Sequence, residues 1–289
     1  MRSTNEMMEL LLTVAREDDR VRAVGMNGSR TNPMVPKDVF QDYDIVYVVT
    51  DMQTFLDDPS WIEVFGERIV MQTPEAIELI PPLNDGTFAY LMLFTDGNRI
   101  DLTLVPFEQS KTWNRGDTLA QVLLDKDQLL PDLTAPTDID YWIQKPTQKF
   151  FDDCCNECWW VSTYVAKGLW RNELTYAYDH LSIVREMLIQ MLKWKIGVQT
   201  DFSLSVGKNG KYLEAYLTKD EWDMFNSTYP RLEVGQMWKA LFVLLDQFSN
   251  VSDEVAESLD FKQEIIDRKK VREYLKHVQV LPVDTKEIL

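Results

Sequence analysis

The sequence predicts an α+β fold, in which an N-terminal mixed sheet with helices is followed by a C-terminal, all-α helical bundle. Short runs of β-forming residues separated by turns are confined to residues 1–140, whereas long stretches with helical periodicity occupy 141–289. The formal net charge of -17 is also uneven, because nearly all of it lies in the first part. Since 289 residues suit two domains, we expect one domain at 1–140 and a second at 141–289.

The N-terminal part begins with a helix and continues with strands and turns. Residues 4–18 carry apolar side chains at helical spacing, and a short strand at 21–26 ends at a glycine-serine turn. The densest strand signal is 45–49, where five β-formers in a row indicate a strand covered on both faces. The other expected elements are a helix at 53–65, a strand at 68–72 and a hairpin of strands 88–94 and 99–105.

The C-terminal part has the pattern of amphipathic helices separated by glycine and proline. Cys154, Cys155 and Cys158 crowd into the first helix at helical spacing, which favours buried, reduced cysteines over a disulfide framework or a zinc site. The expected helices cover about 148–168, 172–196, 209–217, 219–227, 234–250 and 262–279.

The acidic composition limits the classes of partner. A net charge of -17 opposes nucleic acid and an anionic membrane surface, because both require clustered Lys and Arg. It permits a cationic partner or substrate. No segment reaches about 18 apolar residues without charge, and the N-terminus lacks the pattern of a signal peptide. We therefore expect a cytoplasmic protein without a nucleic-acid or membrane partner.

Three acidic residues stand out within the strand pattern. Asp42 and Asp44 are two positions apart at a strand start, so they point to the same face and repel each other unless a cation lies between them. Mg²⁺ suits such carboxylates. Asp101 interrupts the apolar run 100–104, and it would complete a group of three if its strand neighbours that of Asp44. Acids at strand starts and edges also occur without any such function.

A Gly28-Ser29 turn follows the strand at 21–26. Backbone N–H groups at such a turn, together with a small hydroxyl, can bind a phosphate, and glycine permits close approach. Alone the turn carries little weight. It gains weight from its place in the order strand, Gly-Ser turn, spacer, paired acids, strand and later acid.

That order resembles the nucleotidyltransferase superfamily related to polymerase beta, in which the Gly-Ser turn grips the nucleotide triphosphate and three carboxylates hold divalent ions. The words at 28–33 (GSRTNP), 40–45 (FQDYDI) and 96–104 (DGNRIDLTL) are more specific. They resemble the aminoglycoside 6-adenylyltransferase family, also called streptomycin adenylyltransferases. The likeness covers about residues 2–260.

The resemblance implies an N-terminal nucleotidyltransferase catalytic domain and a C-terminal helical substrate-binding domain. It implies transfer of AMP from ATP to a hydroxyl of streptomycin, a cationic aminoglycoside, with two Mg²⁺ ions held by Asp42, Asp44 and Asp101. Asp101 is our first choice for the group that receives the proton of the hydroxyl. The spacing leaves three acids of the helical part as alternatives, namely Asp152, Asp153 and Glu157.

Further candidates come from charged side chains around these motifs. For the phosphates they are Arg30 and, in a glycine-containing stretch, Lys208 and Lys211, of which the resemblance favours Lys208. Each of these three basic residues is also compatible with an exposed position that binds no phosphate. For the guanidinium groups of the acceptor they are acids of the helical part, because carboxylates bind guanidinium with two hydrogen bonds. These acids are Asp152, Asp153, Glu157 and Asp179.

Two rival functions remain open at this stage. One keeps the fold and changes the acceptor to a lincosamide or a protein side chain. The other is a non-catalytic module that binds a nucleotide or another protein. The sequence gives neither the oligomeric state nor a role for the segment from Phe261 onward.

Overall fold

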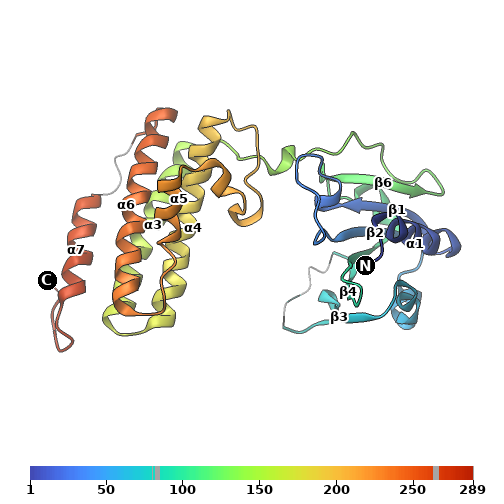
Figure 1. Ribbon diagram of the computed structural model, residues 1–289, viewed down its shortest axis with the longest axis horizontal. Helices are drawn as coiled ribbons and strands as arrows, with labels where there is room; N and C mark the ends of the chain where they lie inside the picture. Colours follow the sequence, from blue (N-terminus) through green and yellow to red (C-terminus); the bar gives the residue numbers. More distant parts are fainter. Residues whose placement is uncertain (80, 82–84, 263–266, 289) are drawn as a thin grey trace. The chain divides into compact units, whose positions relative to one another are not determined.

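The computed structural model describes residues 1–79, 81, 85–262 and 267–288. The chain divides into two compact units, Met1–Asp140 and Tyr141–Leu289, and each is described by itself. The first unit contains a six-stranded mixed sheet and the second is helical (Figure 1), which confirms the predicted α+β fold class.

The sheet of the first unit has the strand order β3-β4-β5-β2-β1-β6. β2 and β5 run parallel, and their register pairs Asp44 with Asp101. The other neighbouring strands are antiparallel. The strands are β1 (Val21–Asn27), β2 (Tyr43–Val49), β3 (Arg68–Gln72), β4 (Phe88–Phe94), β5 (Arg99–Pro106) and β6 (Ala120–Asp125).

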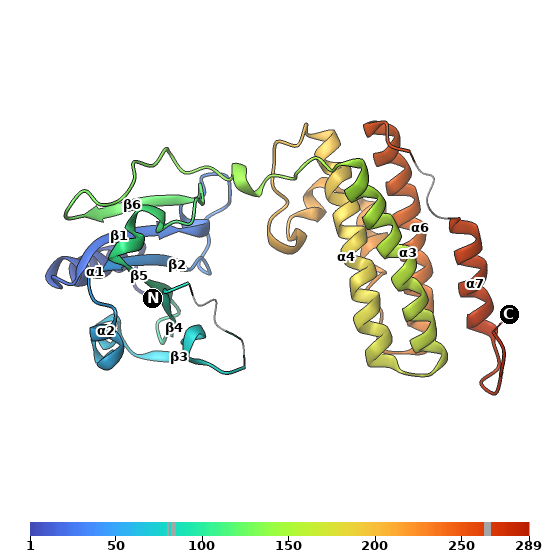
Figure 2. The same cartoon turned by 180° about the vertical axis from the view of Figure 1, so that it is seen from behind.

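One face of this sheet is covered by α1 (Thr4–Glu17), which lies along β1 and β2 (Figures 1 and 2). The helix begins with a capping box between Ser3 and Glu6, which satisfies backbone N–H groups of its first turn. Its apolar stripe packs into the larger core of the unit, and the hydroxyl of Tyr47 donates to the carbonyl of Leu11 at 2.6 Å. α2 (Gln53–Asp57) joins the same core through Phe55.

The opposite face carries a smaller core built around Trp113. The indole lies directly on Gly25 of β1, where an added Cβ would stand 2.0 Å from a ring carbon. Because side chains alternate along a strand, Asp44 shares this face with Val46 and Val48, whereas Tyr43 and Ile45 point to the α1 side. The acidic positions therefore project from the face that α1 leaves open.

The second unit consists of long helices that lie side by side (Figure 2). Its core includes Cys154 and Cys158, and all three cysteines are free, as the sequence pattern indicated. Burial raises the pKa of the Cys154 thiol, which makes it a packing group rather than a reactive one. The helices are α3 (Gln148–Trp170), α4 (Leu174–Gln199), α5 (Lys219–Asn226), α6 (Val234–Leu259) and α7 (Arg268–Val280).

Several expected elements differ from those observed. The helix expected at 53–65 is wrong as one element, because α2 ends at Asp57 and a 3-10 segment, Pro59–Phe65, starts at a proline that cannot continue the hydrogen bonds. The helix expected at 209–217 is instead two 3-10 turns, Lys208–Gly210 and Leu213–Tyr216. β6 was not predicted. Part of the helix expected at 262–279 lies outside the described residues.

None of the helices in the described ranges is both long and apolar enough to cross a membrane.

Candidate active site

The parallel pairing of β2 with β5 places two of the predicted carboxylates on neighbouring strands. Asp44 and Asp101 are direct partners in the ladder, and Asp42 stands just before β2. The sequence made this grouping conditional on the two strands being neighbours, and that condition is met. The three acids therefore lie at the same edge of the open face of the sheet.

A guanidinium group lies among these carboxylates. Arg99 donates from Nε and from a terminal nitrogen to the two oxygens of Asp101, both at 2.7 Å, and its Nε lies 3.7 Å from Asp42 Oδ2. Sequence reasoning did not identify Arg99. The signal was available, because a residue two positions before Asp101 on the same strand points to the same face.

The charges in this group shift the titration of its carboxyls. Burial raises the pKa of Asp44 to about 6, and the negative charges of Asp101 and Asp42 add to that shift. Burial also raises the pKa of Asp42, although Arg99 opposes the shift. Three carboxylates beside a single guanidinium leave an excess of negative charge, which favours the binding of further positive charge.

The Gly28-Ser29 turn touches the same group. Gly28 has φ +75°, and an added Cβ would lie 2.1 Å from Asp44 Oδ2. Glycine is therefore required both by the backbone conformation and by the carboxylate beside it. The N–H of Gly28 is already bound to the carbonyl of Leu119 at 3.1 Å, so phosphate binding would use other groups of the turn.

Asn27 precedes the turn and is another residue that sequence reasoning missed. It pairs with Asp44 in the β1–β2 ladder. Its Oδ1 is buried and has no hydrogen-bond partner within the described part of the chain. A buried acceptor without a donor is costly, so Asn27 Oδ1 is available to accept a hydrogen bond from a group that enters this site.

The carboxylate oxygens of this site are donors of the kind that divalent metal ions bind. Across the described ranges, no three Asp, Glu, His or Cys side chains are already arranged as ligands of one ion. Asp42 and Asp101 nevertheless flank one cationic group, Arg99, and hard oxygen donors are what Mg²⁺ prefers. The donor chemistry fits, and Arg99 stands as the resident cation.

Arg30, the last residue of the turn, makes hydrogen bonds with the chain just before β2. Its Nε donates to the carbonyl of Asp42 at 2.9 Å, and a terminal nitrogen donates to the carbonyl of Gln41 at 2.7 Å. The guanidinium also lies 3.6 Å from the ring centre of Tyr43. These contacts tie the turn to the start of β2, and a contact of Arg30 with a phosphate remains a prediction.

The two candidate lysines belong to the other unit. Lys208 starts a 3-10 turn after Gly207, and Lys211 lies 4.9 Å from the ring centre of Tyr212. A role for either lysine at the nucleotide stays a prediction.

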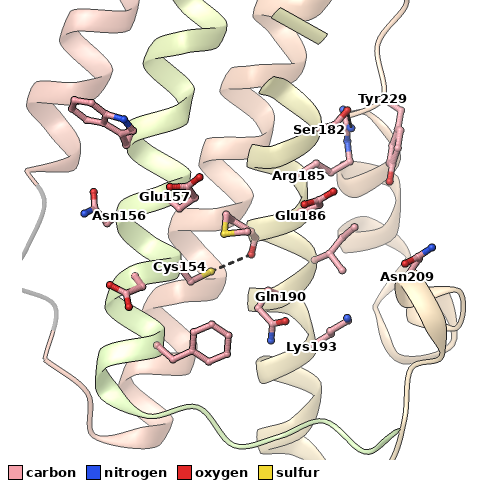
Figure 3. A pocket seen from close by; sticks show the side chains of 15 residues that line it. Cys154, Asn156, Glu157, Ser182, Arg185, Glu186, Gln190, Lys193, Asn209 and Tyr229 are labelled. Carbon is pink, nitrogen blue, oxygen red and sulfur yellow. Dashed lines mark hydrogen bonds between the residues drawn. The ribbon is translucent and has the colours of Figure 1, made fainter. Parts of the chain in front are cut away.

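The helical unit contains a cavity of about 1200 Å³ between α3 and α4 (Figure 3). Glu157 projects from α3 and Glu186 from α4, and both line the cavity with Asp153 and Trp160. Asp153 pairs with Lys149, whereas neither glutamate has an ion pair among the residues that the structure describes.

Not every predicted acid lines this cavity. Asp152 accepts a hydrogen bond from Gln148 at 2.8 Å and lies outside it, and Asp179 is exposed elsewhere on α4. Sequence reasoning missed Glu186, although it lies seven positions after Asp179 on the same helix and therefore on a similar side.

Comparisons with known proteins give one consistent family. The family model described as Streptomycin adenylyltransferase matches residues 1–278. An aminoglycoside 6-adenylyltransferase of Bacillus subtilis (strain 168) is 48% identical over 264 residues, which is 91% of this chain and 93% of that protein. One from Campylobacter jejuni is 46% identical, over 93% of each chain.

A solved structure is also similar. The crystal structure of an aminoglycoside 6-adenyltransferase from Bacillus subtilis has 41% sequence identity and a TM-score of 0.48, covering 97% of this chain and all of that one.

Proposed function

Because this chain belongs to the streptomycin adenylyltransferase family, we propose that it transfers AMP from ATP to a hydroxyl of streptomycin. The products are 6-O-adenylyl-streptomycin and pyrophosphate. The observation that carries this proposal is the group of Asp42, Asp44 and Asp101 around a cation beside the Gly28-Ser29 turn.

The chemistry requires positioning and charge neutralisation more than covalent help from the protein. The acceptor oxygen forms a bond to the α-phosphorus as the bond to the β-phosphate oxygen breaks, and pyrophosphate leaves. We assign the proton of the hydroxyl to the carboxylate of Asp101, with the helical acids Asp152, Asp153 and Glu157 as alternatives.

Asp42 and Asp44 would hold two Mg²⁺ ions, and Asp101 would share the one nearer the acceptor. When bound, these ions neutralise the charge of the triphosphate and of the attacking oxygen. Asn27 Oδ1 is placed to accept a hydrogen bond from a group that arrives with the nucleotide, since its ladder partner is Asp44.

In this proposal residues 1–140 form the catalytic domain and residues 141–289 bind the acceptor. The Gly28-Ser29 turn, with Arg30, binds the triphosphate, and Lys208 or Lys211 assists. Glu157 and Asp153 line a cavity large enough for part of a cationic acceptor, and the exposed ring of Trp160 offers a stacking surface. Such a reaction belongs in the cytoplasm, where ATP is available.

A pyrophosphate-release assay tests the proposal. The full chain is incubated with ATP and Mg²⁺ and with streptomycin, a lincosamide or an unrelated protein as acceptor. We expect release that depends on streptomycin, with a product that carries one AMP. Release with another acceptor alone supports the rival acceptor, and nucleotide binding without release with any acceptor supports a non-catalytic module.

A further inference from the structure

Lys37 makes an unusual set of contacts with the Gly28-Ser29 turn. It lies in the loop between β1 and β2, and its ammonium is within hydrogen-bond distance of three backbone carbonyls. The acceptors are the carbonyl oxygens of Arg30 at 2.7 Å, Asn32 at 3.2 Å and Ser29 at 3.4 Å. No carboxylate forms an ion pair with Lys37 in the described part of the chain.

This arrangement matches the chemistry of an ammonium group. A lysine carries three N–H donors on one atom and no acceptor, so a single side chain can satisfy three converging carbonyls. A planar guanidinium presents its donors in a fixed fork and does not reproduce this pattern. The carbonyl side of the turn is therefore stabilised by a positive charge.

The consequence concerns what the turn presents to its ligand. Carbonyl dipoles near an anionic ligand oppose its binding, and a cation on the carbonyl side offsets them. Directing the carbonyls of Ser29 and Arg30 toward Lys37 leaves the N–H side of the turn for the ligand, and the Ser29 hydroxyl, which accepts from Gln41 at 3.4 Å, can still donate to it. Gln41 supports the same geometry, because its Nε2 donates to the carbonyl of Ser29 at 3.1 Å.

The loop and the turn are held to each other in both directions. Arg30 of the turn donates to the carbonyls of Gln41 and Asp42 at the end of the loop, while Lys37 and Gln41 of the loop donate to the turn. The contacts of Lys37 are the ones made from the middle of the loop. Removing them takes the ammonium from the carbonyls of Arg30 and Asn32, while the hydrogen bond from Gln41 to Ser29 and the ties at Asp42 remain.

We propose that Lys37 is a positioning residue for the nucleotide: its ammonium fixes the Gly28–Arg30 turn in the shape that receives the triphosphate. The inference rests on the proposed function for the identity of the ligand. Lys37 acts through the turn and does not touch the reacting atoms.

Kinetics and nucleotide binding of the full chain test this role. The variants are Lys37→Met, Lys37→Arg and, as a matched control, Lys111→Met, which removes an exposed lysine of the same unit far from the turn in sequence. We measure kcat, the KM of each substrate, the melting temperature, and the affinity for α,β-methylene-ATP with Mg²⁺ by calorimetry. Binding of this analogue can be measured without streptomycin, so it reports on the nucleotide site alone.

We expect Lys37→Met to raise the KM of ATP and weaken analogue binding about tenfold, since several charged hydrogen bonds are lost. The KM of streptomycin and the melting temperature stay near those of the wild type. Lys37→Arg restores part of the affinity, because it keeps the charge but not the three-donor geometry. Lys111→Met behaves as the wild type.

Unchanged analogue affinity in Lys37→Met overturns the inference, and so does a loss that affects both substrates equally and follows a lower melting temperature. Failure of the proposed function looks different. In that case the wild type modifies no streptomycin, yet analogue binding still depends on Lys37. If instead the wild type modifies streptomycin and Lys37→Met matches it in every readout, only the inference fails.

Discussion

The carboxylate of Asp44 occupies the space that a side chain at position 28 would need, since a Cβ on Gly28 would lie 2.1 Å from Asp44 Oδ2. The turn and the acid are thus in direct contact although they belong to different segments of the chain. A side chain at position 28 would therefore displace the Asp44 carboxylate.

Gly28→Ala should lower the activity while the unit still folds. The new methyl group displaces the Asp44 carboxylate, and we expect kcat/KM to fall roughly 100-fold, as for a misplaced reacting group. The unit should still fold, because the displaced atom is the free end of a side chain. Gly97→Ala is the matched control: Gly97 also has positive φ, +85°, but a Cβ there meets nothing within 4 Å. Equal losses of activity in the two variants would show that backbone strain alone is responsible.

Asp44→Asn should remove activity and change the pH dependence of stability. We expect kcat to fall about 1000-fold if the carboxylate holds metal ions. Because the pKa of Asp44 is raised to about 6 in the folded state, the folded state binds its proton more tightly than the unfolded state. The stability that this proton gives is present below about pH 4 and is lost as the pH rises through 6.

The stability part is measured by urea unfolding with EDTA at pH 4.5 and pH 7.5. At the higher pH the Asn variant should be more stable than the wild type by on the order of 1–2 kcal/mol, and at the lower pH the difference should shrink. A difference that is the same at both pH values contradicts the raised pKa.

Arg99→Gln should tighten the binding of divalent cations. The guanidinium is bound to Asp101 and close to Asp42, so an entering cation competes with it. We expect Mn²⁺ affinity, measured by calorimetry at pH 8, to rise up to about fivefold, the scale of a partly exposed ion pair. Arg115→Gln, which breaks a comparable pair with Asp85, is the control. Weaker Mn²⁺ binding in Arg99→Gln would mean that the arginine supports the metal site instead of competing for it.

Glu157→Gln should raise the KM of streptomycin about tenfold, because its carboxylate, which has no ion pair among the described residues, is free to bind a guanidinium in the cavity. Asp153→Asn should have a smaller effect, since Asp153 already pairs with Lys149. A fall in kcat at constant KM in either variant would instead identify that residue as the base.

The KM of streptomycin should also rise with salt concentration up to about 0.5 M, because salt screens charges. A KM that does not change with salt would exclude electrostatic attraction between the protein and streptomycin.

Much of the fold was predictable because its strands follow simple rules. β4 and the part of β2 that follows Asp44 are continuous apolar runs, β5 alternates apolar and polar residues, and α1 has an apolar stripe that its core contacts confirm. The sequence did not predict β6, because Val122 is the single β-branched residue of this strand and the strand lies at an edge of the sheet. This strand is stabilised by its pairing with β1, and its own sequence has little preference for a strand.

The grouping of the acids could be inferred only in part. Alternation predicts that Asp42 and Asp44 share a face, but the presence of Asp101 beside them depends on which strands are neighbours. Lys37 was beyond prediction, because its contacts follow from the path of an irregular loop, which has no periodicity. The chemical role of each acid stays a prediction that the variants above examine.

The pairing of Asp44 with Asp101 joins positions 57 residues apart in the chain (101 minus 44), in a parallel ladder that no short hairpin can produce. Closing a loop of that length costs chain entropy before the paired strands compensate for it, so we expect this contact to form late in folding. The β4–β5 hairpin, and the backbone hydrogen bonds inside each helix of the second unit, join residues that are closer in sequence. During refolding we therefore expect helical signal to return first and nucleotide binding to return with the slower phase. On a ribosome, the site cannot exist until β5 has left the exit tunnel.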